Sequence, residues 1–292
     1  MGEMPTGKAL SCDNGKMIIR HDLELVFLHV PKCAGTRLRN LFRLGAAPHA
    51  IEELWNFSYN EVLHRYVDLA HLPMSDLYTT NNFKYVERYR VVACIRNPYK
   101  RLPSAANEYY RQKSKHHERK VIEEGVTLEM REKYYRKLRL GHNQLDPRFI
   151  HSLPIHRFTH FGTQPMVDWL LHCENLRQEA RELTKELDLP PAIQDAVEIL
   201  PESDPAPEPD SKDLAVAEKL YKYDFKWFEY PNYNCRETSN EPTEDSNKVK
   251  WIHQAPKVQW HWGPIAEQEE PRNVKSCRKN NNEGDQKRNA KT

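Results

Sequence analysis

The sequence predicts a three-layer α/β domain with a central parallel sheet flanked by helices. An apolar run at residues 25–30 passes through a tight basic loop into a helical pattern. The same succession recurs at residues 90–104, and its strand is apolar almost throughout, as is typical of a parallel strand covered on both faces. The 292 residues suffice for one large α/β domain with appendages or for two small domains.

The first third of the chain should supply the first strand and helix. Residues 1–22 are interpreted as a polar leader, and the first strand is expected at 24–30. Apolar residues then recur at helical spacing, with Gly45 as the C-cap. The pattern at 50–66 predicts a second helix with a break, and 70–74 predicts a short strand running into a turn.

The middle of the chain should supply the second strand and helix. A strand is expected at 90–95, and a helix should start after Asn97 as its N-cap. Residues 113–142 carry nine Lys or Arg and five Glu, which fits a solvated helical excursion and a substrate-facing lid equally well. The segment 167–173 fits strand or helix, and 175–188 predicts an amphipathic helix.

The C-terminal part should close the domain with a loop and a helix. Residues 201–210 form a loop rich in proline and acid, and 211–229 predict a helix. The expected domain is therefore 23–233, with 113–146 as a candidate substrate-facing helical insertion. Residues 234–292 predict a polar, partly disordered tail. Three tryptophans of unassigned role interrupt this tail: Trp251, Trp260 and Trp262.

The composition excludes several classes of protein. Lys and Arg total 44 against 42 Asp and Glu, so the net charge gives no case for general nucleic-acid binding. No apolar run approaches the roughly 20 residues that span a bilayer, and the first residues carry no apolar signal core. We therefore expect a soluble, cytoplasmic protein.

The cysteines indicate neither a disulfide framework nor a zinc site. There are six of them, and none form CxxC pairs. Cys33, Cys94 and Cys173 each lie in or beside an apolar run. A buried, reduced thiol is the expected state of these three.

Both strand–loop–helix segments have the chemistry of an anion site. Amide groups at a helix start favour an anion. In the first loop Lys32 adds a charge, Gly35 permits close backbone approach and Thr36 adds a hydroxyl. In the second, Arg96 follows the strand, and Ser104 comes about two helical turns later. Two such sites predict a ligand with anionic groups at both ends.

The first loop differs from the loop of ATP- and GTP-hydrolysing enzymes. No Gly-Lys-Ser/Thr ends it, and no acidic strand end for magnesium is evident. A nucleotide kinase would require ATP and magnesium, and neither is expected here.

Residues 27–36 resemble the 5′-phosphosulfate loop of sulfotransferases that use 3′-phosphoadenosine 5′-phosphosulfate (PAPS). Residues 92–104 resemble their 3′-phosphate motif, Arg-Asp-Pro-x-x-Arg-x-x-Ser. The variant is most similar to the Golgi carbohydrate sulfotransferases and their relatives, including the heparan sulfate 2-O enzymes. Further matches lie at 160–164, 168–176 and 220–230, so the resemblance spans about residues 24–230.

This resemblance implies a P-loop-like fold and sulfuryl transfer from PAPS to a carbohydrate hydroxyl by in-line displacement, without a metal. It implies that Lys32 is catalytic and contacts the phosphosulfate oxygens, and that Arg96 and Ser104 grip the 3′-phosphate. The remaining donor-binding residues would be those of the first loop and helix start: Cys33, Ala34, Gly35, Thr36 and Arg37.

The resemblance also predicts a base that accepts the proton of the acceptor. His71 lies between the two loops, where related enzymes carry a catalytic histidine, and an imidazole suits the role. The alternative for His71 is a histidine that is hydrogen-bonded within a turn. His64 is the reserve candidate, and the carboxylates of Glu52 and Glu53 are further alternatives.

Four other residues bear on how the second loop is interpreted. Arg101 could contact the ligand or pair with an acid on the surface, and the second is favoured. Glu174 is interpreted as a cap of the helix that follows it. Asn97 replaces the usual aspartate but can still cap a helix. Pro103 replaces an apolar residue and removes a backbone hydrogen bond close to Ser104, which predicts a kink.

Two alternative functions stay open at this stage. The acceptor could be a small hydroxylated metabolite, although the basic segment 113–142 favours an anionic glycan. The chain could also be a donor-binding module without catalysis. The resemblance adds the Golgi lumen as an alternative location, for a protein whose membrane anchor lies outside this sequence. The position sulfated and the oligomeric state are not predicted.

Overall fold

The computed structural model describes residues 17–117, 126–139, 147–201 and 208–231. Its main sheet has five strands in the order β3-β1-β2-β6-β9. Their bounds are Ile51–Leu54, Met17–Arg20, Leu25–Leu28, Arg90–Ile95 and Trp169–His172. β2, β6 and β9 are parallel, whereas β1 is antiparallel to both of its neighbours. The predicted α/β class is confirmed, with a mixed sheet whose central part is parallel.

The sheet begins earlier than the sequence indicated. β1 lies inside the predicted leader, and all four of its residues are buried. Arg20 ends this strand and is 0% exposed. Its burial is compensated because the guanidinium donates to the Phe42 carbonyl at 2.6 Å and pairs with Asp22 at 2.7 Å. The charge of Arg20 interrupts the apolar pattern from which a buried strand is predicted. Because β1 belongs to the sheet, the predicted domain boundary at residue 23 was wrong.

The predicted helix at 50–66 was also wrong. This segment forms the edge strand β3 and a separate two-stranded hairpin, β4 (Phe57–Asn60) and β5 (Arg65–Asp68). The predicted strand at 70–74 is a 3-10 turn, η2 (Leu69–His71), followed by α2 (Met74–Leu77). The Asp68 carboxylate accepts from the Ala70 amide at 3.0 Å and starts the turn.

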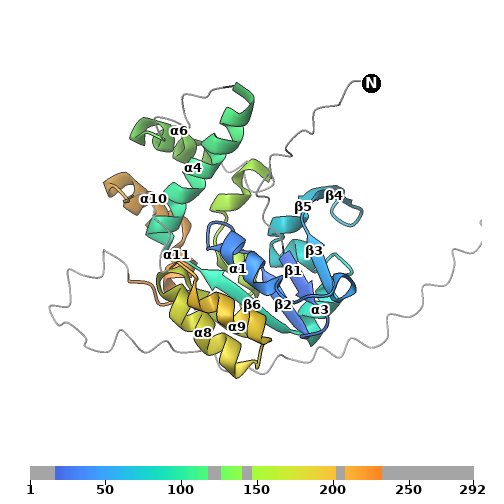
Figure 1. The fold of residues 1–292 in the computed structure, drawn as a ribbon. Helices are drawn as coiled ribbons and strands as arrows, with labels where there is room; N and C mark the ends of the chain where they lie inside the picture. Colours follow the sequence, from blue (N-terminus) through green and yellow to red (C-terminus); the bar gives the residue numbers. More distant parts are fainter. Residues whose placement is uncertain (1–16, 118–125, 140–146, 202–207, 232–292) are drawn as a thin grey trace, which may run out of the picture. The chain divides into compact units, whose positions relative to one another are not determined.

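Helices cover the sheet. Figure 1 shows α1 (Gly35–Phe42), α8 (Leu176–Glu186) and α9 (Pro191–Glu198) over one face; α1 packs on β1 and α8 on β9. The predicted helix at 175–188 is confirmed by α8, but α9 was not predicted. Further helices supply Leu77, Val86 and Phe158 to the same core. They are α2, α3 (Phe83–Arg88) and α7 (His156–Thr159).

A second group of helices carries its own core. α4 (Pro98–His117), α6 (Leu128–Arg139) and α10 (Ser211–Leu220) pack together, as Figure 1 shows, around a cluster rich in tyrosine. The predicted helix start is confirmed, since Asn97 Oδ1 accepts from the Tyr99 amide at 2.9 Å. The helix runs on through Pro103. The predicted helix at 211–229 is divided by Tyr221 into α10 and α11 (Lys222–Trp227).

The remaining elements are short. They are η1 (Pro48–Ala50), η3 (Pro147–Ser152), η4 (Cys173–Asn175), β7 (His160–Phe161) and β8 (Gln164–Pro165). The tail predicted for 234–292, with its three tryptophans, lies outside the described residues, as do parts of the predicted 113–146 insertion. Within the described ranges, no helix has both the length and the apolar character needed to cross a bilayer.

Candidate active site

The loop between β2 and α1 forms an anion cradle. Lys32 and Ala34 have left-handed backbones, with φ of 64° and 55°. Such residues are costly outside glycine and are common at functional sites, where they turn successive amide groups into a concavity. The concavity opens at the start of α1, where the amides of Gly35 and Thr36 precede the first backbone hydrogen bond of the helix, from Arg37 to Ala34. The fold therefore gives this loop the geometry that suits a phosphate or sulfate.

Gly35 is required by close contact with His29. A Cβ atom at Gly35 would lie 1.8 Å from His29 Nε2, and no such contact is tolerated. His29 follows β2 and is only 8% exposed. Burial, and then the charge of His71, lower the pKa of His29 well below its usual value, so its ring is neutral.

Gly35→Ala is expected to destabilise the fold by about 1–3 kcal/mol, since the new methyl group must displace the imidazole or the loop. Urea unfolding measures the change. Gly162→Ala serves as the comparison for backbone strain without a steric contact, because Gly162 has a positive φ of 63° and nothing within 4 Å of an added Cβ. The double variant His29→Ala/Gly35→Ala should recover part of the loss. An unchanged cost in that background would contradict the contact.

The second loop is tied to the first and to the third parallel strand. Arg96, 4% exposed, donates from Nη1 to the Lys32 carbonyl at 3.4 Å. Glu174 follows β9 and accepts from the Asn97 amide at 2.8 Å. The Glu174 carboxylate therefore accepts a hydrogen bond at the start of α4. The sequence had instead predicted that Glu174 caps α8. Ser104 lies half-buried on α4, two turns beyond Asn97.

Arg101 corrects another prediction. It is fully buried, where the sequence favoured a surface ion pair. Its Nε donates to the Pro31 carbonyl at 3.0 Å, and its guanidinium lies 5.4 Å from the centre of the Tyr221 ring. Arg101 thus ties the first loop to α4 through the Pro31 carbonyl. Packing decides which face of α4 is turned towards that loop. The sequence pattern alone does not predict this face.

Lys32 reaches from the loop to α4. Its Nζ lies 3.3 Å from Glu108 Oε2, and the same carboxylate accepts two bonds from Arg111. Burial raises the pKa of Glu108, but the Arg111 hydrogen bond and the Lys32 charge outweigh it and set the pKa to about 2. Glu108 is therefore ionised at neutral pH, and its low pKa makes it a poor general base. No sequence signal linked these residues, which are 76 positions apart.

Glu108 should make the stability depend on acid pH. Its folded pKa of about 2 lies below the ordinary 4.5, so the unfolded chain binds the extra proton. Its contribution, up to about 3 kcal/mol, is complete above pH 4.5 and is lost as the pH falls towards 2. The unfolding free energy of the wild type should thus exceed that of Glu108→Gln by more at pH 6 than at pH 3.5. Equal differences at the two values would contradict this account.

His71 lies in a cluster of three histidines. Its ring centre is 4.6 Å from that of His29 and 5.0 Å from that of His151. Burial and His71 lower the pKa of His151 to about 3, so His151 is neutral, like His29. His71 differs from both because its Nδ1 is 2.8 Å from Asp68 Oδ2. Burial raises the pKa of Asp68, but the bond and charge of His71 outweigh it, and the net pKa is lowered.

The Asp68–His71 pair determines which ring nitrogen is available. A carboxylate on Nδ1 holds a proton there and leaves Nε2 as the acceptor. The pair can therefore take a proton at Nε2 while the carboxylate stabilises the charged ring. The charge of Glu108 raises the pKa of His151 and that of Lys32 lowers it, so the histidine cluster lies close to the first loop.

The other candidate bases lie elsewhere. His64 is in the turn of the β4–β5 hairpin, and the extended β5 separates it from His71. Glu52 pairs with His21 at 2.8 Å and Glu53 pairs with Arg43 at 2.6 Å, both from the edge strand β3. The fold thus places His71 against His29, beside the first loop, whereas His64, Glu52 and Glu53 lie on the hairpin turn and the edge strand.

The cysteines beside the site are inert. Cys33, Cys94 and Cys173 are buried and free, as predicted. Burial raises the pKa of Cys33 well above its usual value, so the loop carries a protonated thiol and no nucleophilic thiolate. Among the residues that the structure describes, no group of three metal-binding side chains is found.

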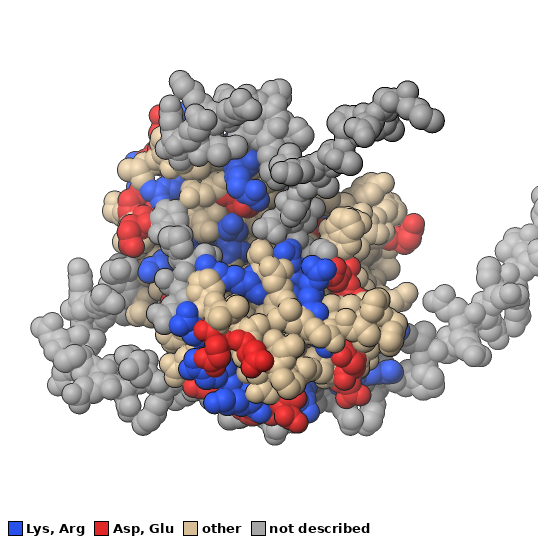
Figure 2. Space-filling model, in the orientation of Figure 1, with Lys and Arg blue, Asp and Glu red and all other residues tan. Residues whose placement is uncertain are grey.

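The surface near the cradle is basic. Figure 2 shows Lys and Arg side chains over α1 and between α1 and α4. α1 carries the half-buried Arg37, and the exposed Arg43 follows it. The field on this side of the loop therefore favours an anionic ligand.

One comparison with known proteins, that with family profiles, agrees with this geometry. The profile of the sulfotransferase family matches residues 15–190, which is more than half of the chain and includes both loops and His71. Neither a curated protein nor a solved structure gives a significant match. By the extent of the family match, the chain belongs to the sulfotransferase family.

Proposed function

We propose that the protein transfers a sulfuryl group from PAPS to a hydroxyl of a carbohydrate. The observation that carries the proposal is the meeting of an anion cradle, with Lys32 on it, and the Asp68–His71 pair. Family membership supports sulfuryl transfer, and the donor and acceptor are our inference.

The residues of the two loops fit the donor. Gly35 leaves the space that its side chain would fill to the His29 ring, and Lys32 lies in the loop that forms the cradle. The amides of Gly35 and Thr36 would hold the phosphosulfate, and Arg96 with Ser104 would hold the 3′-phosphate. When bound, PAPS supplies an activated sulfuryl group on a phosphate that gains negative charge as it leaves. Lys32 and the α1 amides stabilise that charge, which lowers the barrier.

His71 moves the proton of the acceptor. Its Nε2 accepts the proton from the hydroxyl as the hydroxyl oxygen attacks sulfur. Asp68 holds Nδ1–H and stabilises the imidazolium that results. His29 and His151 pack against the ring and fix its orientation.

An exposed aromatic face beside His71 supports a carbohydrate acceptor. Phe57 and Tyr66 are 59% and 64% exposed on the β4–β5 hairpin. Tyr59 pairs with Tyr66 across the strands and Phe57 pairs with Asp68, and paired residues share a face of the sheet. The aromatic face therefore continues into the carboxylate that holds His71. Exposed apolar patches of this kind mark binding sites, and aromatic rings suit the C–H faces of sugar rings.

A transfer assay tests the proposal. PAPS labelled in its sulfate is offered with a panel of glycans and small alcohols, and label is expected in a glycan. Label only in small alcohols would favour a metabolite as acceptor. Binding of the desulfonated product without any transfer would show a donor-binding module and would overturn the proposal.

A further inference from the structure

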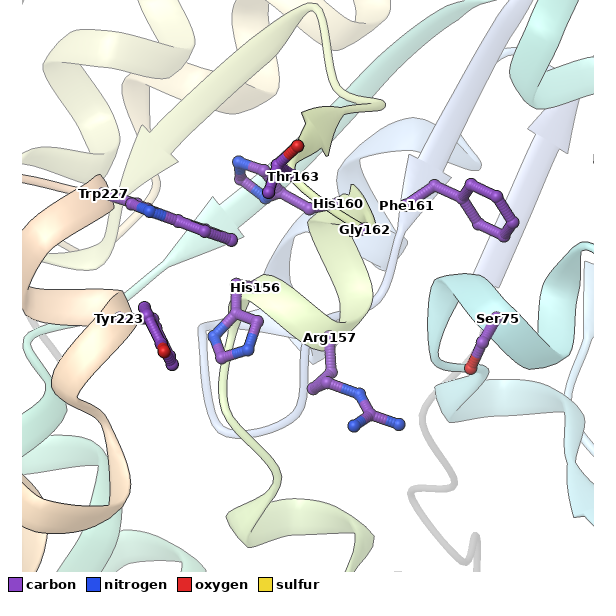
Figure 3. Close-up of a pocket in the computed structure, with 9 residues that line it drawn as sticks. All are labelled: Ser75, His156, Arg157, His160, Phe161, Gly162, Thr163, Tyr223 and Trp227. Carbon is purple, nitrogen blue, oxygen red and sulfur yellow. The ribbon is translucent and has the colours of Figure 1, made fainter.

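A second cavity lies outside the donor loops. It has a volume of about 420 Å³ and is bounded by α7, α11, α2 and the β7–β8 turn. Figure 3 shows Tyr223, Trp227, His156 and His160 on one side, and Arg157 and Ser75 towards the other. The donor site uses none of these six residues.

The aromatic wall is held in place by contacts among its rings. Tyr223 and Trp227 are one turn apart on α11, with ring centres separated by 5.6 Å. The ring of His156 meets both edge-on, at 5.7 and 5.1 Å, and His160 lies 4.7 Å from Trp227. Tyr223 is nevertheless 54% exposed, so the wall offers aromatic surface to a ligand.

His156 is oriented by a buried carboxylate. Asp224, with 0% exposure, lies 2.7 Å from His156 Nδ1 and accepts from the amides of Ile155 and His156. With Nδ1 held by Asp224, Nε2 of His156 is the nitrogen available to a ligand. Burial and the His156 charge lower the pKa of His160 to about 4, so His160 is neutral at physiological pH.

Arg157 supplies the charge of the cavity. Its side chain is exposed, and no carboxylate of the described residues forms an ion pair with it. A guanidinium binds a carboxylate or sulfate through two parallel hydrogen bonds. An aromatic wall with an adjacent guanidinium is complementary to a ring that bears an acidic group.

The cavity is within a short distance of the proposed base. Ser75 follows His71 by four residues, so their Cα atoms are at most about 14 Å apart. His156 follows His151 by five residues, which allows at most about 18 Å. The rings of His71 and His151 are in contact. An oligosaccharide with one hydroxyl at His71 can therefore extend into the cavity.

We propose that this cavity binds an acidic sugar unit of the acceptor, one that carries a carboxylate or a sulfate. Its acid group pairs with Arg157, and its ring lies on Tyr223 and Trp227. The inference rests on the proposed function and adds to it a recognition site for the unit beside the one that is sulfated.

Calorimetric binding to the full chain tests the site directly. The probes are a hexasaccharide of alternating glucuronate and N-acetylglucosamine, its sulfated form, and a carboxyl-reduced form without charge. At least one acidic probe should bind the wild type and bind Arg157→Gln at least tenfold more weakly, with Tyr223→Ala also weakened. The control is Lys222→Ala, which removes a cation from α11, next to Tyr223 but outside the cavity. The neutral probe should not distinguish Arg157→Gln from the wild type.

Three outcomes would overturn the inference: no binding of either acidic probe, equal binding by Arg157→Gln and Lys222→Ala, or a neutral probe that binds as tightly as the acidic ones. Kinetics separate this failure from failure of the function. If glycans are sulfated and Arg157→Gln leaves the acceptor KM unchanged, the cavity is not the site and the function stands. If acidic probes bind through Arg157 and nothing is sulfated, the function fails and the cavity stands.

Discussion

Replacing Lys32 with alanine is expected to lower kcat by about 10²- to 10³-fold, the usual loss when one group that stabilises transition-state charge is removed. Lys32 extends from the cradle and is held 3.3 Å from Glu108. In the proposed reaction its ammonium faces the phosphate that gains charge. Steady-state turnover with saturating donor and acceptor measures the effect.

Glu108→Gln is the matched control for Lys32. If Lys32 served only to pair with Glu108, the two variants would lose the same activity and the same stability. We expect Glu108→Gln to keep turnover within a fewfold of the wild type while it loses stability. Equal losses of kcat in the two variants would assign Lys32 a structural role.

His71→Ala is expected to lower kcat by about 10²- to 10⁴-fold, the usual contribution of a positioned general base. Asp68→Asn should lower kcat as well, since an amide can no longer stabilise the charged ring. Steady-state turnover of both variants with saturating donor and acceptor checks this.

His64→Ala is the control for His71. His64 lies in the hairpin turn, beyond the extended β5, and its replacement should leave turnover unchanged. If His71→Ala kept near-normal turnover, the assignment of the base would fail. Loss of activity in His64→Ala would instead revive the reserve candidate.

Local patterns predicted the two strand–loop–helix segments, and the structure has both. In each, the apolar run, the break and the helix start are adjacent in sequence, so short-range rules suffice. The segment 50–66 failed for the opposite reason. Its apolar residues match helical spacing, yet its first part pairs with β1, with Glu53 opposite Ile18. Strand formation depends on such a partner more than on the residues themselves.

The sequence by itself determined the two anion loops and placed His71 between them. Only the tertiary structure joined His71 to Asp68, His29 and His151, and joined Lys32 to Glu108 across 76 residues. It also buried Arg101 beneath the first loop. The physical reason is that an apolar strand, its break and the helix start after it are encoded by residues adjacent in sequence. Which side chains meet across elements depends instead on how helix faces and strand ends pack, and that depends on the whole core.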